Sequence, residues 1–233
     1  MIEIAVYIEG GGPTVAQREE LRRGFDDLFT HEKSRAREKR GGLRLICCGG
    51  RQEAYDAFMN ALAVNPQIAN AFLVDSETAI AAAPADNTGK PDKARDAAIR
   101  IAHLQQKDGT DGRGQGDGWQ FAGVALERIH LMVQCMETWI VADPDALEGF
   151  YKQNFKRNDL PKRINLEEES KADIYTKLES ATKNTQKGQY GKIKHASKLL
   201  LLIDPEKVAA RCPRFSIFRD RLNESIDVDP ASA

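Results

Sequence analysis

The chain has 233 residues, of which 41% are hydrophobic and 30% are charged, and its formal net charge is −1. This length can bury a sizeable core as one large α/β domain, or as one domain with an appendage. The near-neutral charge excludes any general electrostatic argument for nucleic acid or membrane binding. The four cysteines form no CxxC motif, the first residues lack a secretory signal, and no apolar run approaches about 18 residues. We therefore expect a soluble cytoplasmic protein with no membrane partner.

The first 75 residues alternate between short apolar runs and amphipathic stretches. The apolar runs predict three strands, at 2–8, 43–47 and 71–74. Apolar residues at helical spacing predict two helices between them, at 14–30, with Thr14 as its N-cap, and at 52–64. A charged turn is expected at 35–42. This β-α-β-α-β order predicts parallel strands with right-handed crossovers.

The second half of the chain has a different character. A helix is expected near 93–106, and a Gly-rich segment at 108–118 cannot pack a core, so it is predicted to be a mobile loop or lid. The remaining predicted elements are a strand at 128–133 and helices at 135–142, 144–150, 174–202 and 207–222. We divide the chain into an α/β core at 1–145, with a Gly-rich insertion at about 79–123, and a helical, basic C-terminal part at 146–233 packed on it.

Positive charge is concentrated in one segment. Residues 151–198 contain twelve lysines and arginines but only six acidic residues, a local excess of six positive charges. Such a stretch in a neutral protein is the usual footprint of a polyanion. A solvated lysine-rich helix surface is an equally good explanation.

Acidic residues follow two of the predicted strands. Glu9 ends the first apolar run and precedes three glycines, while Asp75 and Glu77 follow the third run. Ligands of open α/β sheets bind beyond the carboxyl ends of the strands, so we expect these side chains to share one crevice. Clustered carboxylates repel one another and suit Mg²⁺ or Mn²⁺, ions that stabilise charge on a phosphoryl group and activate water. The alternative is that Asp75 caps a helix and Glu9 is a solvated loop residue.

These residues resemble those of TOPRIM domains, the metal-dependent catalytic folds of topoisomerases, DnaG-type primases and OLD-family nucleases. Such domains carry Glu-Gly after the first strand and an acidic-x-acidic motif after the third. The second motif is usually Asp-x-Asp; here it is Asp75-Ser76-Glu77, which keeps the carboxylates and lengthens one arm. The resemblance implies a TOPRIM or Rossmann-like α/β fold, in which a mostly parallel sheet of about four strands is flanked by helices and followed by a helical C-terminal part.

A closer resemblance covers nearly the whole chain. The chain looks like a bacterial family with a TOPRIM-like fold, domain-of-unknown-function family 4276. Its members share five segments, here YIEGGG at 7–12, CGGR at 48–51, LVDSE at 73–77, HLMVQCMETW at 130–139 and KGQYGK at 187–192. The chain is also similar to RloB-like proteins of restriction and phage-defence loci, which have a comparable Phe-Glu-x-Trp helix.

The resemblance implies a role for each acidic residue. Glu9 would be the acid–base residue or a metal ligand, and Asp75 and Glu77 would hold the metal. Glu137, on the helix after the fourth strand, would add a ligand or orient one. A helix-surface carboxylate without a functional role is the alternative for Glu137.

Basic residues are candidates for binding the phosphate groups of a substrate. Arg51 could point into the crevice and fork onto a phosphate, or it could form an ion pair with one of the acidic residues. Lys187, Lys192 and His195 are the best candidates for a basic clamp, in which Lys192 would stabilise the charge of the transition state. Ordinary exposed lysines are the alternative.

Two weaker signals concern the loops. Gly10 and Gly11 could cradle a phosphate at a helix N-terminus, although their loop lacks the ending of a P-loop, so it is not interpreted as an ATP site. Trp119 could stack on a base, but it is more simply the anchor of its loop.

The function that we expect from these patterns is metal-dependent phosphodiester cleavage of nucleic acid, DNA or RNA, in phage defence or genome maintenance. One alternative is a partner subunit, inactive alone, of an ATPase encoded nearby. Another is a hydrolase of nucleotides or small phosphoesters, which a closed pocket would favour over an open basic groove. A homodimer is also possible.

Overall fold

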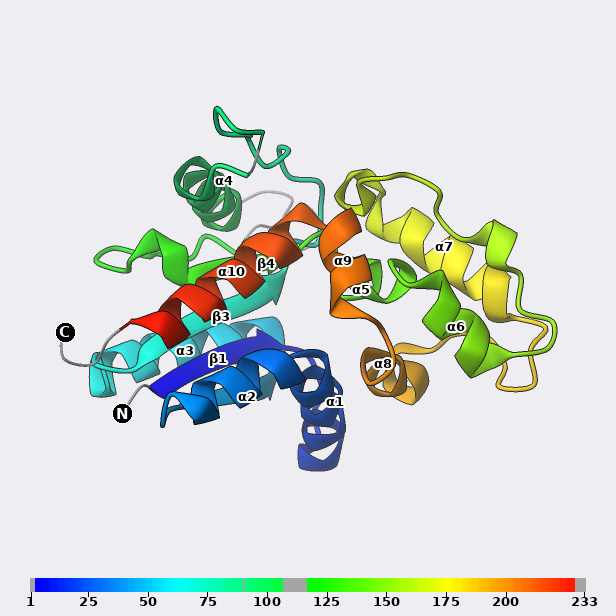
Figure 1. Ribbon diagram of the computed structural model, residues 1–233, viewed down its shortest axis with the longest axis horizontal. Coiled ribbons are helices and arrows are strands. Elements are labelled where there is room, and N and C mark those ends of the chain that lie inside the picture. Colours follow the sequence, from blue (N-terminus) through cyan, green and yellow to red (C-terminus); the bar gives the residue numbers. More distant parts are fainter. Residues whose placement is uncertain (1–2, 90, 107–116, 229–233) are drawn as a thin grey trace.

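The protein is built around a sheet of four parallel strands in the order β2-β1-β3-β4 (Figure 1). Its structure, a computed structural model, describes residues 3–89, 91–106 and 117–228. The strands are β1 (Glu3–Glu9), β2 (Gly42–Gly49), β3 (Ala69–Asp75) and β4 (Ile129–Met132). The two central strands, β1 and β3, are buried over most of their length, as in parallel sheets covered on both faces. The predicted α/β class is confirmed.

Helices cover both faces of the sheet. One face packs against α1 (Val15–Leu28), α2 (Thr30–Glu38) and α10 (Pro213–Asp227), and the other against α3 (Arg51–Val64) and α4 (Lys93–Gln105). An apolar core fills the space on each side of the sheet. Successive residues of a strand point to opposite faces, so Leu73 lies in the core under α1, α2 and α10, and its neighbours Phe72 and Val74 lie in the core under α3 and α4.

The other helices form a lobe beside the carboxyl ends of β3 and β4, on the right in Figure 1. They are α5 (Glu137–Val141), α6 (Pro144–Tyr151), α7 (Lys171–Thr182), α8 (Lys192–Leu200) and α9 (Pro205–Arg211), with 3-10 helices η2 (Arg157–Asp159) and η3 (Leu166–Glu168); a further one, η1 (Leu126–Arg128), precedes β4. Trp139 of α5 joins the lobe to the helices that cover the sheet, because its ring contacts those of Phe25 on α1 and Phe215 on α10. One apolar core therefore runs through both parts.

The predicted turn at 35–42 is wrong, because α2 continues to Glu38. This helix is mostly charged, and its buried face consists of Glu32 and Ala36, four positions apart. With so few apolar residues, the sequence shows no helical periodicity of hydrophobic positions there. Residues 107–116, which make up most of the predicted Gly-rich lid, lie outside the described residues. Within the described ranges, no helix combines the length and the apolar character that crossing a membrane requires.

Two long helices were also predicted wrongly, since each is interrupted. The helix expected at 174–202 consists of α7 and α8 with residues 183–191 between them, where Gly188 has a positive φ of 80°. The helix expected at 207–222 consists of α9 and α10. Pro213 occupies the first turn of α10, where its missing N–H is harmless, and it disfavours helical backbone in the residue before it.

Candidate metal centre

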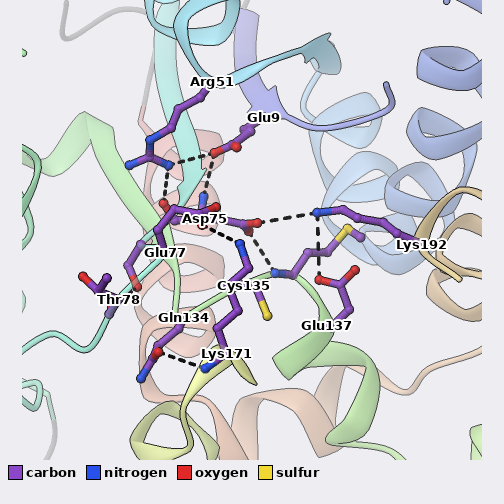
Figure 2. Close-up of polar contacts among 12 residues, drawn as sticks. Glu9, Arg51, Asp75, Glu77, Thr78, Gln134, Cys135, Glu137, Lys171 and Lys192 are labelled. Atoms are coloured by element: carbon purple, nitrogen blue, oxygen red, sulfur yellow. Dashed lines mark hydrogen bonds and ion pairs between the residues drawn. The ribbon is translucent and has the colours of Figure 1, made fainter. Parts of the chain in front are cut away.

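Three carboxylates meet at the carboxyl edge of the sheet (Figure 2). Glu9 is the last residue of β1, Asp75 is the last residue of the neighbouring β3, and Glu77 follows two residues later. One ligand oxygen from each lies within 4.8 Å of those of the other two. The parallel pairing of β1 and β3 thus brings together the residues that the sequence predicted to share a crevice.

Glycines bend the chain sharply between β1 and α1. Gly10 and Gly49 exchange two backbone hydrogen bonds of 2.8 and 2.9 Å, and Gly10 has a φ of 129° that other residues rarely adopt. A Cβ atom at Gly10 would lie only 2.8 Å from Leu21 Cδ2. The predicted N-cap Thr14 is confirmed, in a capping box with Gln17. The loop can therefore lie directly against α1, leaving the Glu9 side chain at the open edge.

Glu77 is held in an uncommon backbone conformation. Its φ is 65°, and its N–H donates to the Gln134 carbonyl at 2.9 Å, while the N–H of Ser76 donates to the Met132 carbonyl at 3.0 Å. These bonds extend the pairing of β3 with the β4 segment and turn Glu77 back toward the other carboxylates. Its side chain accepts a hydrogen bond of 2.5 Å from Lys171, the first residue of α7.

Asp75 is the most buried of the three carboxylates. Its Oδ1 accepts a hydrogen bond of 2.9 Å from the Met136 N–H, and its Oδ2 lies 3.6 Å from the Lys192 ammonium. Burial raises the pKa of Asp75 to about 7; Lys192 opposes this rise and the nearby carboxylates, including Glu9 and Glu77, add to it.

Glu9 is bound to Arg51 and to the backbone. Its Oε2 accepts hydrogen bonds from Arg51 at 2.9 Å and from the Asp75 N–H at 3.2 Å. Burial raises the pKa of Glu9, and the guanidinium of Arg51 partly offsets this rise. Arg51 also forks onto Asp117 through two bonds of 2.7 Å. The ion-pair alternative for Arg51 therefore holds in this structure, since its donors are already used by carboxylates.

Glu137 lies apart from the three carboxylates of the candidate metal centre. It is fully buried on α5, and its Oε1 accepts a hydrogen bond of 2.9 Å from the Tyr190 hydroxyl. Its other oxygen is 3.9 Å from Lys192, which thus sits between Asp75 and Glu137. Burial and the charge of Glu137 raise the pKa values of both Tyr190 and Tyr175. Glu137 is buried, so it is not a surface carboxylate, and it lies where it can orient Lys192. Its role as a metal ligand stays a prediction.

The charges of the described residues at this edge do not balance. Arg51 and Asp117 form their own bidentate pair. Four carboxylates then face two lysines, namely Glu9, Asp75, Glu77 and Glu137 against Lys171 and Lys192. With all groups ionised, two negative charges are in excess, which matches the charge of one divalent cation. The oxygen-only donor set of Glu9, Asp75 and Glu77 also fits Mg²⁺ or Mn²⁺.

The site lies within a segment that a family model recognises. Residues 8–223 match the family described as Domain of unknown function (DUF4276). The chain belongs to this family. No curated protein and no solved structure matches the chain in the corresponding comparisons. The matched range of this DUF4276 member contains every acidic and basic residue of the candidate metal centre.

Two residues of the predicted basic clamp do not face the centre. Lys187 is exposed and its ammonium lies 4.3 Å from the centre of the Phe150 ring. His195 is only 2% exposed, and its Nδ1 accepts a hydrogen bond from the Gly191 N–H, so it caps its own helix from inside the core. Of the three predicted clamp residues, Lys192 alone contacts the carboxylates.

Trp119 is the anchor of its loop. It is 5% exposed, its indole N–H donates to Gln52 at 3.0 Å, and its ring stacks on Tyr55 at a centroid distance of 4.8 Å. The guanidinium of Arg51 lies 5.0 Å from the ring centroid. Stacking on a base, the other prediction for Trp119, would require the ring to leave these partners.

Two residues of the centre were missed by sequence reasoning. Lys171 appeared only as one of twelve bases in the basic segment, and Asp117 only as part of the Gly-rich segment. Neither belongs to a local sequence motif. Their position at the centre depends on how α7 and the loop before Trp119 pack in the folded protein, which the sequence alone does not show.

Proposed function

We propose that the protein is a divalent-metal-dependent nuclease that hydrolyses phosphodiester bonds of nucleic acid. The observation that carries this proposal is the group of Glu9, Asp75 and Glu77 at the ends of two adjacent parallel strands, with Lys171 and Lys192 beside it. The resemblance to TOPRIM domains and to RloB-like and OLD-family nucleases supports it. That resemblance also suggests a role in phage defence or genome maintenance.

The surface of the helical lobe suits a nucleic acid backbone. Seven lysines of the basic segment are exposed there: Lys152, Lys156, Lys162, Lys183, Lys187, Lys194 and Lys198. Such lysines bind phosphates largely by releasing counterions, so we expect affinity to fall as salt concentration rises. DNA and RNA are equally compatible with this surface.

The chemistry divides between the ion and the side chains. A divalent cation held by Glu9, Asp75 and Glu77 would stabilise negative charge on a phosphoryl group and lower the pKa of a water molecule. Glu9 has a raised pKa and a partly exposed side chain, so it is suited to accept and return a proton. Lys192, oriented by Asp75 and Glu137, places a positive charge where a transition-state oxyanion would form.

The test is cleavage of single-stranded and duplex DNA and RNA by the purified protein with Mn²⁺ at low salt. We expect cleavage, and we expect Glu9→Gln and Asp75→Asn to slow it by about 10²-fold or more. Glu19→Gln, an exposed residue of α1 outside the centre, is the matched control and should leave the rate unchanged. Calorimetry should show Mn²⁺ binding by the wild type that Asp75→Asn weakens.

Full cleavage by Glu9→Gln would rule out its assigned role, and an absence of both Mn²⁺ binding and cleavage would rule out the nuclease. Mn²⁺ binding through Asp75 without cleavage would favour the alternative of a partner subunit that needs a separate ATPase. Release of phosphate from mononucleotides would favour the small-phosphoester hydrolase.

A further inference from the structure

An open pocket of about 230 Å³ lies next to the metal centre, between α1 and α8. Glu9 and Lys192 line it, so it shares two residues with the centre. Most of its lining residues have no role in the proposed metal binding or in the binding of the nucleic acid backbone. Its position means that a group bound in it would lie directly beside the phosphate site of the proposed nuclease.

The packing of the two helices creates the pocket. They touch at Gly24, where a Cβ atom would lie 2.7 Å from the Ser197 carbonyl oxygen and 2.9 Å from Leu200 Cβ. Nearer the N-terminal ends of both helices, Leu21 and Ile193 line open space. The helices are therefore in close contact at one point and separate toward the glycine loop.

Both apolar and polar residues line the pocket. Leu21, Met136, Ile193 and Ala196 supply the apolar walls, and the glycine loop adds backbone without side chains. The polar residues are Gln17, Glu20 and Ser197, and the Ser197 hydroxyl donates to Glu20 Oε1 at 3.0 Å. Glu20 Oε2 has no hydrogen bond from a described side chain and can accept one from a ligand.

The combination of apolar and polar lining residues suits a nucleobase. A nucleobase has two flat apolar faces and an edge of hydrogen-bond donors and acceptors, and enzymes that bind a single base hold it in a pocket of this kind. The pocket volume of about 230 Å³ gives room for one base.

We propose that this pocket takes one unpaired nucleobase while its phosphate lies between Glu9 and Lys192. This inference rests on the proposed nuclease function and narrows its substrate to single-stranded nucleic acid or to an unpaired nucleotide within a duplex. The acceptor oxygen of Glu20 further favours bases with an amino group, adenine, cytosine or guanine, over thymine and uracil.

Filling the pocket mouth tests the proposal. Ile193 is 57% exposed at the rim, so Ile193→Trp should fold, and its ring should block entry of a base. We expect at least a tenfold rise in KM for a fluorescein-labelled single strand and at least tenfold weaker binding of AMP and CMP. Mn²⁺ affinity should stay within twofold of the wild type. Ile164→Trp, at a residue 86% exposed outside the pocket, is the matched control.

Specificity provides a second measurement. The wild type should cut a single strand at least tenfold faster than the duplex of the same sequence, and it should bind AMP and CMP more tightly than UMP and TMP. Glu20→Gln should reduce this preference, whereas Glu19→Gln, on the next residue of α1, should not.

The outcomes separate the two proposals. If Mn²⁺ is bound and strands are cut, but Ile193→Trp behaves as the wild type or duplex is cut as fast as single strand, the pocket inference fails and the nuclease stands. If AMP or CMP binds and Ile193→Trp abolishes that binding, while Mn²⁺ binding and cleavage are both absent, the pocket stands and the nuclease fails.

Discussion

Two buried clusters of charge occupy different parts of this fold, and they differ in balance. The Arg214 cluster consists of Asp96, Arg100, Glu167 and Arg214, all nearly inaccessible to solvent. Asp96 accepts from Arg100 at 2.7 Å and from Arg214 at 2.9 Å, and Arg214 also pairs with Glu167 at 3.1 Å. Two acids thus meet two bases. In the metal centre, four carboxylates face two lysines, and a pocket opens beside them.

The difference distinguishes a cluster whose charges balance from one that we propose to be functional. Arg214 joins α10 to α4, to η3 and to the Ala81 carbonyl, so the Arg214 cluster connects segments that are distant in sequence. Buried charges whose signs balance can be retained without a ligand. An excess of buried carboxylates raises their pKa values and is typical of sites that bind a cation or move a proton.

The largest effect is expected from breaking the balanced cluster. Arg214→Met removes a base and leaves Asp96 and Glu167 buried without it, which should lower the free energy of unfolding by about 3–5 kcal/mol. Denaturant unfolding monitored by circular dichroism measures this. Arg95→Met is the matched control, because Arg95 is 74% exposed and its pair with Asp92 should contribute less than about 1 kcal/mol. Equal effects of the two variants would contradict a structural role for the Arg214 cluster.

The candidate metal centre should respond to pH because burial, helped by the neighbouring carboxylates, raises the pKa of Asp75. Burial raises the pKa of Asp75 from 3.8, the value of an unperturbed aspartate in the unfolded chain, to about 7 in the folded protein. The folded state therefore holds this proton more tightly than the unfolded state does. The contribution of Asp75 to the stability of the metal-free protein should therefore be greatest below about pH 4 and should fall as pH rises toward 7. Mn²⁺ affinity should rise over the same range, because the ion and the proton compete for the carboxylate.

Asp75→Asn isolates this contribution. Burial also raises the pKa of Glu167 to about 7, so the informative quantity is the difference between variant and wild type. The variant should gain stability relative to the wild type by up to about 1.4 kcal/mol per pH unit between pH 4 and 7. Asp27→Asn, an exposed position of α1, should show no such difference. Parallel pH curves for wild type and Asp75→Asn would show that Asp75 does not hold a proton in this range.

The same contrast shows what sequence can reveal. Glu9, Asp75 and Glu77 were predicted because each lies at or just beyond the end of an apolar run, and parallel pairing puts such ends at one edge. Lys171 was not predicted, since its contact with Glu77 spans 94 positions and depends on how α7 packs. Glu137 was predicted to add a metal ligand or to orient one, but its partner Tyr190, 53 positions away, is not visible in any local pattern.

Secondary structure follows the same division. The strands were predicted to within a few residues because aliphatic runs are local signals, and the α/β class followed from their order. The charged α2 was missed because its burial depends on α10, which packs against it from the other end of the chain: Arg219 donates to the buried Glu32 at 3.0 Å. The Arg214 cluster, too, joins residues up to 118 positions apart and gave no signal in the sequence.

The smallest effect is expected where the metal centre meets the tyrosines of the lobe. Tyr190→Phe removes the hydroxyl that donates to Glu137 Oε1, and no hydrogen bond from a described residue reaches the other oxygen of Glu137. A hydrogen bond to a charged group contributes about 1.5–3 kcal/mol, so we expect a loss of stability of about that size. Because Glu137 lies 3.9 Å from Lys192 and can orient it, kcat for the proposed cleavage should also fall severalfold while KM stays unchanged. Tyr151→Phe is the control, because the Tyr151 hydroxyl is buried without a partner among the described residues, and its removal should be neutral or stabilising. A stability loss in Tyr190→Phe with unchanged kcat would show that Glu137 has only a structural role. Asp75 would then be the residue that positions Lys192.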